Sequence, residues 1–299
     1  MSTDLINIEN ENMSCLAAIK RYQATKKPIK TILCGVVSLL LLKITPTFAH
    51  GPIFSPGPET LYKDGIEFQL DYYRSKSARA SENEQAIGLG YGITQDWEIS
   101  VELPYLTANE DGSKNSGTGN VQLETRYRLW RMDSFGKQDS ITGFVTAVLD
   151  TAKQTINPML SYGANDFIVG LAYGQESLIW QRWASLSYRF NGENDDGLNR
   201  GDQLFADASI GWRSEMPQYY KSDTLWMIEL NVEHSQTSQQ NNISLKDSGG
   251  TEVFISPGVI WAYRNIALKG GIQLPIYNNL KGDQNNADHR IKFSIDINY

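Results

Sequence analysis

The sequence predicts an all-β protein, an antiparallel transmembrane β-barrel of about 12 strands, on three observations. Apolar and polar residues alternate with a period of two through most of residues 65–299, as strand side chains do. The connections between these segments are short and long in turn, which is typical of transmembrane barrels. Helical periodicity is not evident in this part of the chain.

Residues 1–49 predict a cleavable export signal. Five basic side chains between residues 20 and 30 precede an apolar stretch, residues 31–42, that is shorter than the ~20 residues of a spanning helix. Residues 47–49 read Thr-Phe-Ala and form an acceptable cleavage site, which would leave His50 first in the mature chain. The leader is long, and Met13 is an alternative start.

Cysteine content and charge exclude several classes of function. Cys15 and Cys34 both lie in the leader, so the mature chain has no thiol for a disulfide, a zinc site or a nucleophile. The mature chain has 21 basic and 31 acidic residues, a net charge of −10. Because no basic patch is available to meet phosphates, we expect no nucleic-acid partner.

Residues 50–64 form a separate Pro-rich segment. Pro52, Pro56 and Pro58 remove three backbone donors, so a regular strand is excluded here. The segment could hang in the periplasm or fold into the barrel lumen as a plug, and we favour the lumen.

The barrel itself is expected over residues 65–299. The connections at 94–96, 174–178 and 264–265 are tight, whereas 107–117, 191–201, 236–250 and 278–287 are long and rich in Gly, Asn, Asp and Ser. An even number of strands places both ends of the barrel on the side of the short turns. The expected strands are 65–75, 83–94, 96–106, 118–131, 139–150, 164–174, 178–190, 202–214, 223–235, 251–264, 265–277 and 287–299.

The last strand and the tryptophans indicate a membrane. Residues 291–299 alternate and end on an aromatic, Tyr299, which resembles the terminal strand of outer-membrane barrels and implies recognition by the insertion machinery. The Trp side chains, with many Tyr, mostly fall near expected strand ends, where aromatic rings form two girdles at the membrane interfaces. We therefore expect the outer-membrane bilayer as a partner and the Gram-negative outer membrane as the location. The tryptophans are Trp97, Trp130, Trp180, Trp183, Trp212, Trp226 and Trp261.

Two motifs carry a family resemblance. Residues 91–105 read YGITQDWEISVELPY, a strand, a tight turn and a Trp-Glu strand ending in Leu-Pro-Tyr. Residues 117–128 run from Gly-Thr-Gly-Asn-Val to Glu-Thr-Arg-Tyr-Arg, with Asn120 where Asp is usual. Together they resemble the MetA-pathway-of-phenol-degradation family of barrels. The resemblance implies a porin-like outer-membrane channel or transporter for small hydrophobic or aromatic compounds, and it identifies no binding residue.

Charged side chains are assigned to the lumen, because Arg or Lys facing lipid at the midplane costs about 2–4 kcal/mol. Two interpretations stay open: pairing of Glu98 or Glu102 with Arg126 or Arg128, which we favour, or a polar path that sets selectivity. Glycines at 88, 90 and 92 leave a bare inward strip, either for the N-terminal segment or a solute, or as a device for curvature. The candidate lumen residues are Glu98, Glu102, Glu124, Arg126, Arg128, Glu229 and Glu233.

Other functions have weaker support. A lipid hydrolase would need a Ser with a His base, and His234-Ser235 lies at an outer strand end but matches no known motif. His289 is expected at the rim, and the imidazole and α-amine of a terminal His50 would suit Cu(II) only with further ligands. We therefore expect no enzyme, cofactor or metal, and keep the hydrolase and a non-transporting structural barrel as alternatives.

Overall fold

The computed structural model describes residues 51–152, 158–218 and 220–299. Within these ranges no helix is long and apolar enough to cross a membrane. The same ranges hold twelve long antiparallel strands that form one sheet with a short strand, β4 (Ser113–Thr118). The long strands are β1 (Ile66–Ser77), β2 (Ala80–Gly92), β3 (Trp97–Glu110), β5 (Val121–Ser134), β6 (Lys137–Leu149), β7 (Asp166–Ser177), β8 (Trp180–Phe190), β10 (Gln203–Arg213), β11 (Asp223–Ser235), β14 (Gly250–Tyr263), β15 (Ile266–Leu280) and β16 (Ala287–Asn298).

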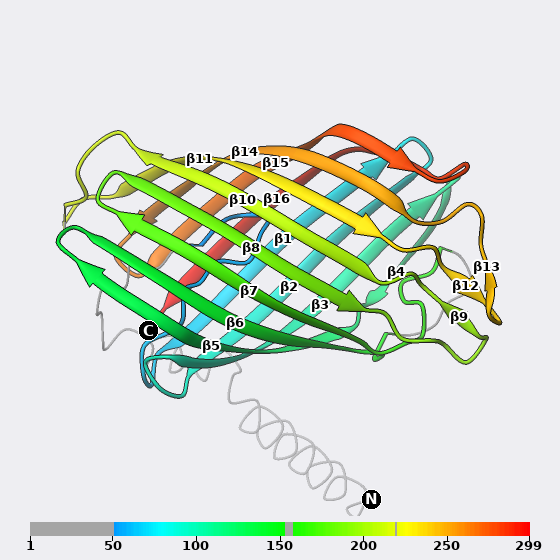
Figure 1. Ribbon diagram of the computed structural model, residues 1–299, viewed down its shortest axis with the longest axis horizontal. Coiled ribbons are helices and arrows are strands. Elements are labelled where there is room, and N and C mark those ends of the chain that lie inside the picture. Colours follow the sequence, from blue (N-terminus) through cyan, green and yellow to red (C-terminus); the bar gives the residue numbers. More distant parts are fainter. Residues whose placement is uncertain (1–50, 153–157, 219) are drawn as a thin grey trace, which may run out of the picture. The chain divides into compact units, whose positions relative to one another are not determined.

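The sheet closes into a barrel in which neighbours in sequence are neighbours in space (Figure 1). Closure joins the first strand to the last, with Glu67 of β1 opposite Asn298 of β16. β4 pairs with the end of β3, and the two form a hairpin that continues beyond the barrel wall. A second small sheet, of β9 (Leu198–Asn199), β12 (Gln239–Gln240) and β13 (Ile243–Ser244), joins two of the long loops. Closed pairing of the twelve long strands leaves no edge of the barrel wall unpaired, which a β-structure in lipid requires.

All twelve predicted strands are confirmed, with one change in the connections. The expected loop between the first two strands is a two-residue turn, because β1 and β2 extend to Ser77 and Ala80. The Ser77 hydroxyl donates to the carbonyl of Ala80 at 3.2 Å and accepts from its N–H at 3.3 Å, which closes the turn. Most of the other connections at this end are longer than those at the opposite end, so this end is the outer one and the chain termini of the barrel lie at the periplasmic end.

The outer surface of the barrel is an apolar band with an aromatic belt. Leu89, Leu103 and Leu186 are each more than half exposed, as expected for side chains that face lipid. Six tryptophans are exposed near the periplasmic ends of their strands, so they form one belt, and Tyr105 and Tyr277 lie nearer the outer end. Trp183 does not belong to this belt, since it is 4% exposed and faces the lumen.

A β-bulge in β5 sets the direction of one belt residue. The register with β6 shifts between Arg128 and Trp130, so Leu129 is an extra residue. Strict alternation would put Trp130 on the lumen face with Arg128, whereas the bulge leaves both Leu129 and Trp130 exposed on the outside. The lumen face, in contrast, is mainly polar and encloses residues 51–65, which carry the candidate site.

Candidate functional site

The N-terminal segment (residues 51–65) is held at its start by one carboxylate of β11. Glu229 is 0% exposed. Its oxygens accept the backbone N–H groups of Ile53 at 2.7 Å and Phe54 at 3.1 Å, and the Ser55 hydroxyl at 2.8 Å. Ile53 packs in a buried apolar cluster with Trp183 and with residues of β11 and β14. This end of the segment is therefore fixed by charge-assisted hydrogen bonds and by apolar burial together.

The middle of the segment contacts β5, β6 and β8. The Arg126 guanidinium donates to the carbonyl of Gly57 at 3.0 Å, and the Thr142 hydroxyl donates to the carbonyl of Pro58 at 2.5 Å. The Trp183 indole N–H donates to Glu59 at 2.9 Å. A Pro-rich stretch cannot pair these carbonyls in a ladder, so side chains of the wall supply the donors.

The end of the segment crosses the glycines of β2. The N–H of Leu61 donates to Glu98 at 2.9 Å, and the N–H of Asp64 donates to the carbonyl of Gly92 at 2.8 Å. A Cβ on Gly92 would overlap the carbonyl oxygen of Tyr62, and one on Gly90 would lie 3.1 Å from Leu61 Cδ1. Of the roles considered for the glycine strip, space for the segment is therefore the one that Gly90 and Gly92 have.

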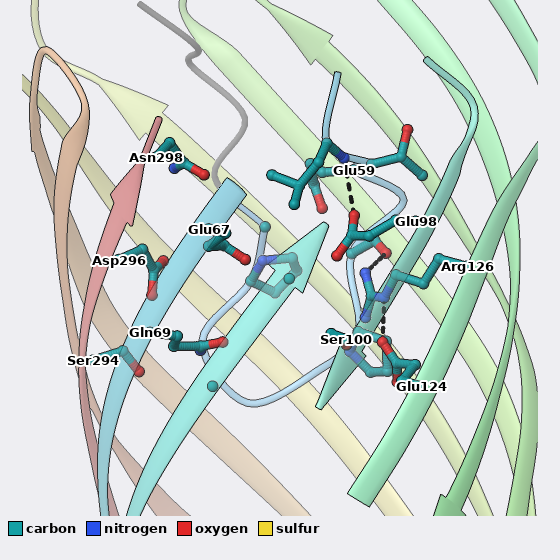
Figure 2. Close-up of a pocket in the computed structure, with 18 of the residues that line it drawn as sticks. Glu59, Glu67, Gln69, Glu98, Ser100, Glu124, Arg126, Ser294, Asp296 and Asn298 are labelled. Carbon is teal, nitrogen blue, oxygen red and sulfur yellow. Dashed lines mark hydrogen bonds and ion pairs between the residues drawn. The ribbon is translucent and has the colours of Figure 1, made fainter. Parts of the chain in front are cut away.

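A cavity of about 600 Å³ remains beside the segment, against β1, β2, β3, β5, β15 and β16 (Figure 2). Its wall includes six carboxylates and five basic side chains, so the lining is strongly polar and nearly balanced in charge. The apolar contribution comes from the segment, through Ile53, Phe54 and Leu61. The charged lining residues are Glu59, Glu67, Glu98, Glu102, Glu124, Asp296, Arg126, Arg128, Arg131, Lys269 and Lys292.

The ion pairs on this wall differ from the expected ones. Arg126 pairs with Glu124, two residues away on the same strand, and Arg128 lies 3.6 Å from Asp96 in the adjoining turn. Glu102 accepts a hydrogen bond from Gln122 at 2.9 Å. Within the residues that the structure describes, the favoured pairing of Glu98 or Glu102 with Arg126 or Arg128 is therefore wrong. Glu98 is opposite Arg126 in the ladder, but its carboxylate turns to the segment.

The structure brings five of the seven candidate lumen residues together around the cavity: Glu98, Glu102, Glu124, Arg126 and Arg128. Glu229 lies outside the cavity, beneath the start of the segment. Glu233 lies nearer the outer end, where it pairs with Arg290 at 2.5 Å.

Four residues that the sequence analysis did not assign to the lumen contribute to the site: Glu67, Thr142, Trp183 and Lys269. Alternation from exposed neighbours could have assigned Glu67 and Trp183 to the lumen, since Ile66 and Trp180 point outward. Nothing in the sequence indicates that Thr142 meets residue 58 or that Lys269 pairs with Asp296.

The histidines considered for chemistry have ordinary surroundings where they are described. His234 Nδ1 is 2.8 Å from the hydroxyl of Thr251. The hydroxyl of Ser235 accepts a hydrogen bond from the side chain of Gln203 at 3.1 Å. His234 and Ser235 therefore do not pair with each other as base and nucleophile. The hypotheses on His50 and on the leader concern positions outside the described residues.

Comparison with known proteins finds one matching family and several similar barrel structures. A family model with the description "Putative MetA-pathway of phenol degradation" matches residues 52–286. The crystal structure of an outer membrane channel from Pseudomonas putida F1 is similar, with a TM-score of 0.70 and 13% identity over 82% of this chain and 99% of that one. The β-domain of the Bordetella autotransporter BrkA gives a TM-score of 0.48 at 12% identity, over 79% of this chain and 99% of that one. No curated protein matches by sequence.

Proposed function

The chain belongs to the family described as "Putative MetA-pathway of phenol degradation", and on that premise we propose that it is a channel that passes small solutes across the outer membrane. The barrel is an outer-membrane protein, with a closed sheet and an apolar exterior. The observation that carries the proposal is the cavity of about 600 Å³ between the N-terminal segment and the charged wall, because a lumen with remaining space is what a channel needs.

We propose that the N-terminal segment acts as a plug that narrows the lumen. Support comes from its hydrogen bonds to the side chains of Glu98, Arg126, Thr142, Trp183 and Glu229, which belong to five different strands. A segment tied at so many points limits passage to the space on one side of it. The candidate lumen residues Glu98, Glu102, Glu124, Arg126 and Arg128 then set selectivity along that space.

For the solute we propose small amphipathic molecules, including aromatic ones. The family description concerns the degradation of phenol, a small aromatic compound. The cavity itself has an apolar side on the segment and a charged side on β1, β3 and β16, which suits a molecule with one apolar and one polar end.

Export and insertion complete the proposal. We propose that the leader is removed before His50 and that the insertion machinery reads the C-terminal strand ending in Tyr299. The alternation of β16, which pairs with both β1 and β15, supports this role, because the strand that the machinery would recognise also closes the barrel.

The test is single-channel conductance of the refolded mature protein in a planar bilayer, with and without residues 50–63. We expect a small conductance in the intact protein and a larger one after truncation. Equal conductance in both forms would refute the plug, and silence in both would refute the channel and favour a structural barrel. Labelling of the folded protein by a fluorophosphonate probe would instead favour the hydrolase alternative.

A further inference from the structure

Hydrogen-bond acceptors without donors gather at the periplasmic end of the cavity. The side chain of Asp296 is 4% exposed, and its Oδ2 pairs with Lys269 Nζ at 2.8 Å. Its Oδ1 has no hydrogen-bond partner within the described residues, and neither has Oδ1 of Asn298, which is 6% exposed. A buried acceptor left without a donor costs about 1–3 kcal/mol, so such atoms usually meet a ligand or water.

Glu67 adds a third acceptor to these two. It lies opposite Asn298 in the β1–β16 ladder, and Asp296 is two residues further along β16 on the same face. Side chains in this direct and diagonal relation lie close enough to share one small ligand. In the part of the chain that the structure describes, the Glu67 carboxylate forms no ion pair and accepts no hydrogen bond. Figure 2 shows Glu67, Asp296 and Asn298 on the same side of the cavity, away from Arg126.

The local charge favours a cation. With both carboxyl groups ionised, Glu67 and Asp296 carry two negative charges against the one positive charge of Lys269, which gives this end of the cavity a net charge of −1. The described residues place no group of three or more His, Cys, Asp or Glu side chains to hold a metal ion. A primary ammonium group carries one positive charge and three donors, which matches three acceptors and one unbalanced negative charge.

We propose that the cavity end formed by Glu67, Asp296 and Asn298 binds the ammonium group of a small amine solute. The proposal deepens the proposed function, and rests on it, by naming amphipathic amines as a solute class for the channel. The apolar part of the amine would lie against Leu61 of the N-terminal segment, which lines the same cavity.

The test uses benzylammonium and its neutral counterpart, benzyl alcohol, on the full mature protein. Binding is followed by fluorine NMR line broadening of a fluorinated benzylammonium with the protein in nanodiscs, which does not depend on conduction. We expect saturable binding that unlabelled benzylammonium displaces and benzyl alcohol does not. Conductance of the same preparations is recorded separately, with benzylammonium expected to block it in the same concentration range.

Two variants and a control locate the site. Glu67→Gln removes a carboxylate without breaking an ion pair, and binding should weaken at least about tenfold because a charge-assisted hydrogen bond is lost. Asn298→Asp adds a carboxylate to the same three side chains and should strengthen binding. Asp207→Asn makes the same change as Glu67→Gln on the lumen face of β10, outside the cavity, and should leave binding unchanged.

Each outcome has a definite meaning. No saturable binding in the wild type, equal competition by benzyl alcohol, or unchanged affinity in Glu67→Gln would overturn the amine site, since the acceptors would then be met by water or by a protonated carboxyl. Conductance without amine binding would overturn the site and leave the channel intact. Amine binding without conductance would support the site and refute the channel. If Glu67→Gln does not fold, Asn298→Asp alone must bind more tightly, or the proposal fails.

Discussion

Neutralising Glu229 should release the start of the N-terminal segment. The carboxylate accepts hydrogen bonds from Ile53 N–H, Phe54 N–H and the Ser55 hydroxyl, and it is completely buried. A hydrogen bond to a charged group contributes about 1.5–3 kcal/mol and a neutral one about 0.5–1.5 kcal/mol, so Glu229→Gln loses about 1–1.5 kcal/mol per donor. Over three donors the anchoring of the segment weakens by about 3–4.5 kcal/mol.

This loss is large enough to see in single-channel records. Because each 1.4 kcal/mol is a factor of ten, the ratio of released to anchored segment should rise by about 100- to 1,000-fold. We expect the channel of the Glu229→Gln variant to open more often than the wild type. Its conductance should approach that of the form that lacks residues 50–63. A single cysteine in place of Pro58, which is fully buried, should at the same time become reactive to a membrane-impermeant thiol reagent.

Glu233→Gln is the matched control for this prediction. It makes the same change four residues along β11 on the same face, but Glu233 pairs with Arg290 and contributes no hydrogen bond to the segment. Its opening and its thiol reactivity at position 58 should resemble the wild type. If Glu229→Gln behaves like Glu233→Gln in both measurements, the anchoring argument is refuted.

Two further substitutions test the packing of the segment and of an outer loop. Gly92→Ala should destabilise the barrel by about 1–3 kcal/mol, measured by urea unfolding in vesicles, because its Cβ overlaps the backbone carbonyl of Tyr62. Asp166→Asn should leave Arg189 and Arg200 without their shared carboxylate, which now lies 2.5 and 2.6 Å from them. Removing one partner of a buried pair costs about 3–5 kcal/mol, and the lower end applies here since both arginines are partly exposed, so loop 191–202 should become sensitive to external protease.

Both substitutions have controls. Gly88→Ala places a Cβ 3.2 Å from the flexible side chain of Gln69 and should be milder than Gly92→Ala. Asp196→Asn alters an exposed loop carboxylate and should leave protease sensitivity unchanged. Equal stability of the two alanine variants, or a protease-resistant loop in Asp166→Asn, would show that these contacts are not important.

Alternation of apolar and polar residues with a period of two predicted the strands and most of the lumen face. It failed where a β-bulge interrupts the alternation. Glu98 and Arg126 face inward as expected, because both lie in uninterrupted stretches of alternation. Trp130 is outward only because the bulge at Leu129 shifts the register, which strict alternation does not predict. Trp183 lies inside, as alternation from the exposed Trp180 predicts, and not in the belt with the other tryptophans.

The sequence alone determined that this chain forms a closed membrane barrel with a polar interior. Alternation and the lengths of the connections are local properties, and closure follows because lipid leaves no other partner for a strand edge. Which lumen side chains meet was decided only by the tertiary structure. Residue 53 reaches Glu229, which is 176 positions away, and Glu67 comes to lie opposite Asn298 only when the first and last strands pair. Such contacts depend on the register between strands and on the path of the N-terminal segment, whose sequence has no periodicity. Neither can be predicted from a local stretch of the sequence.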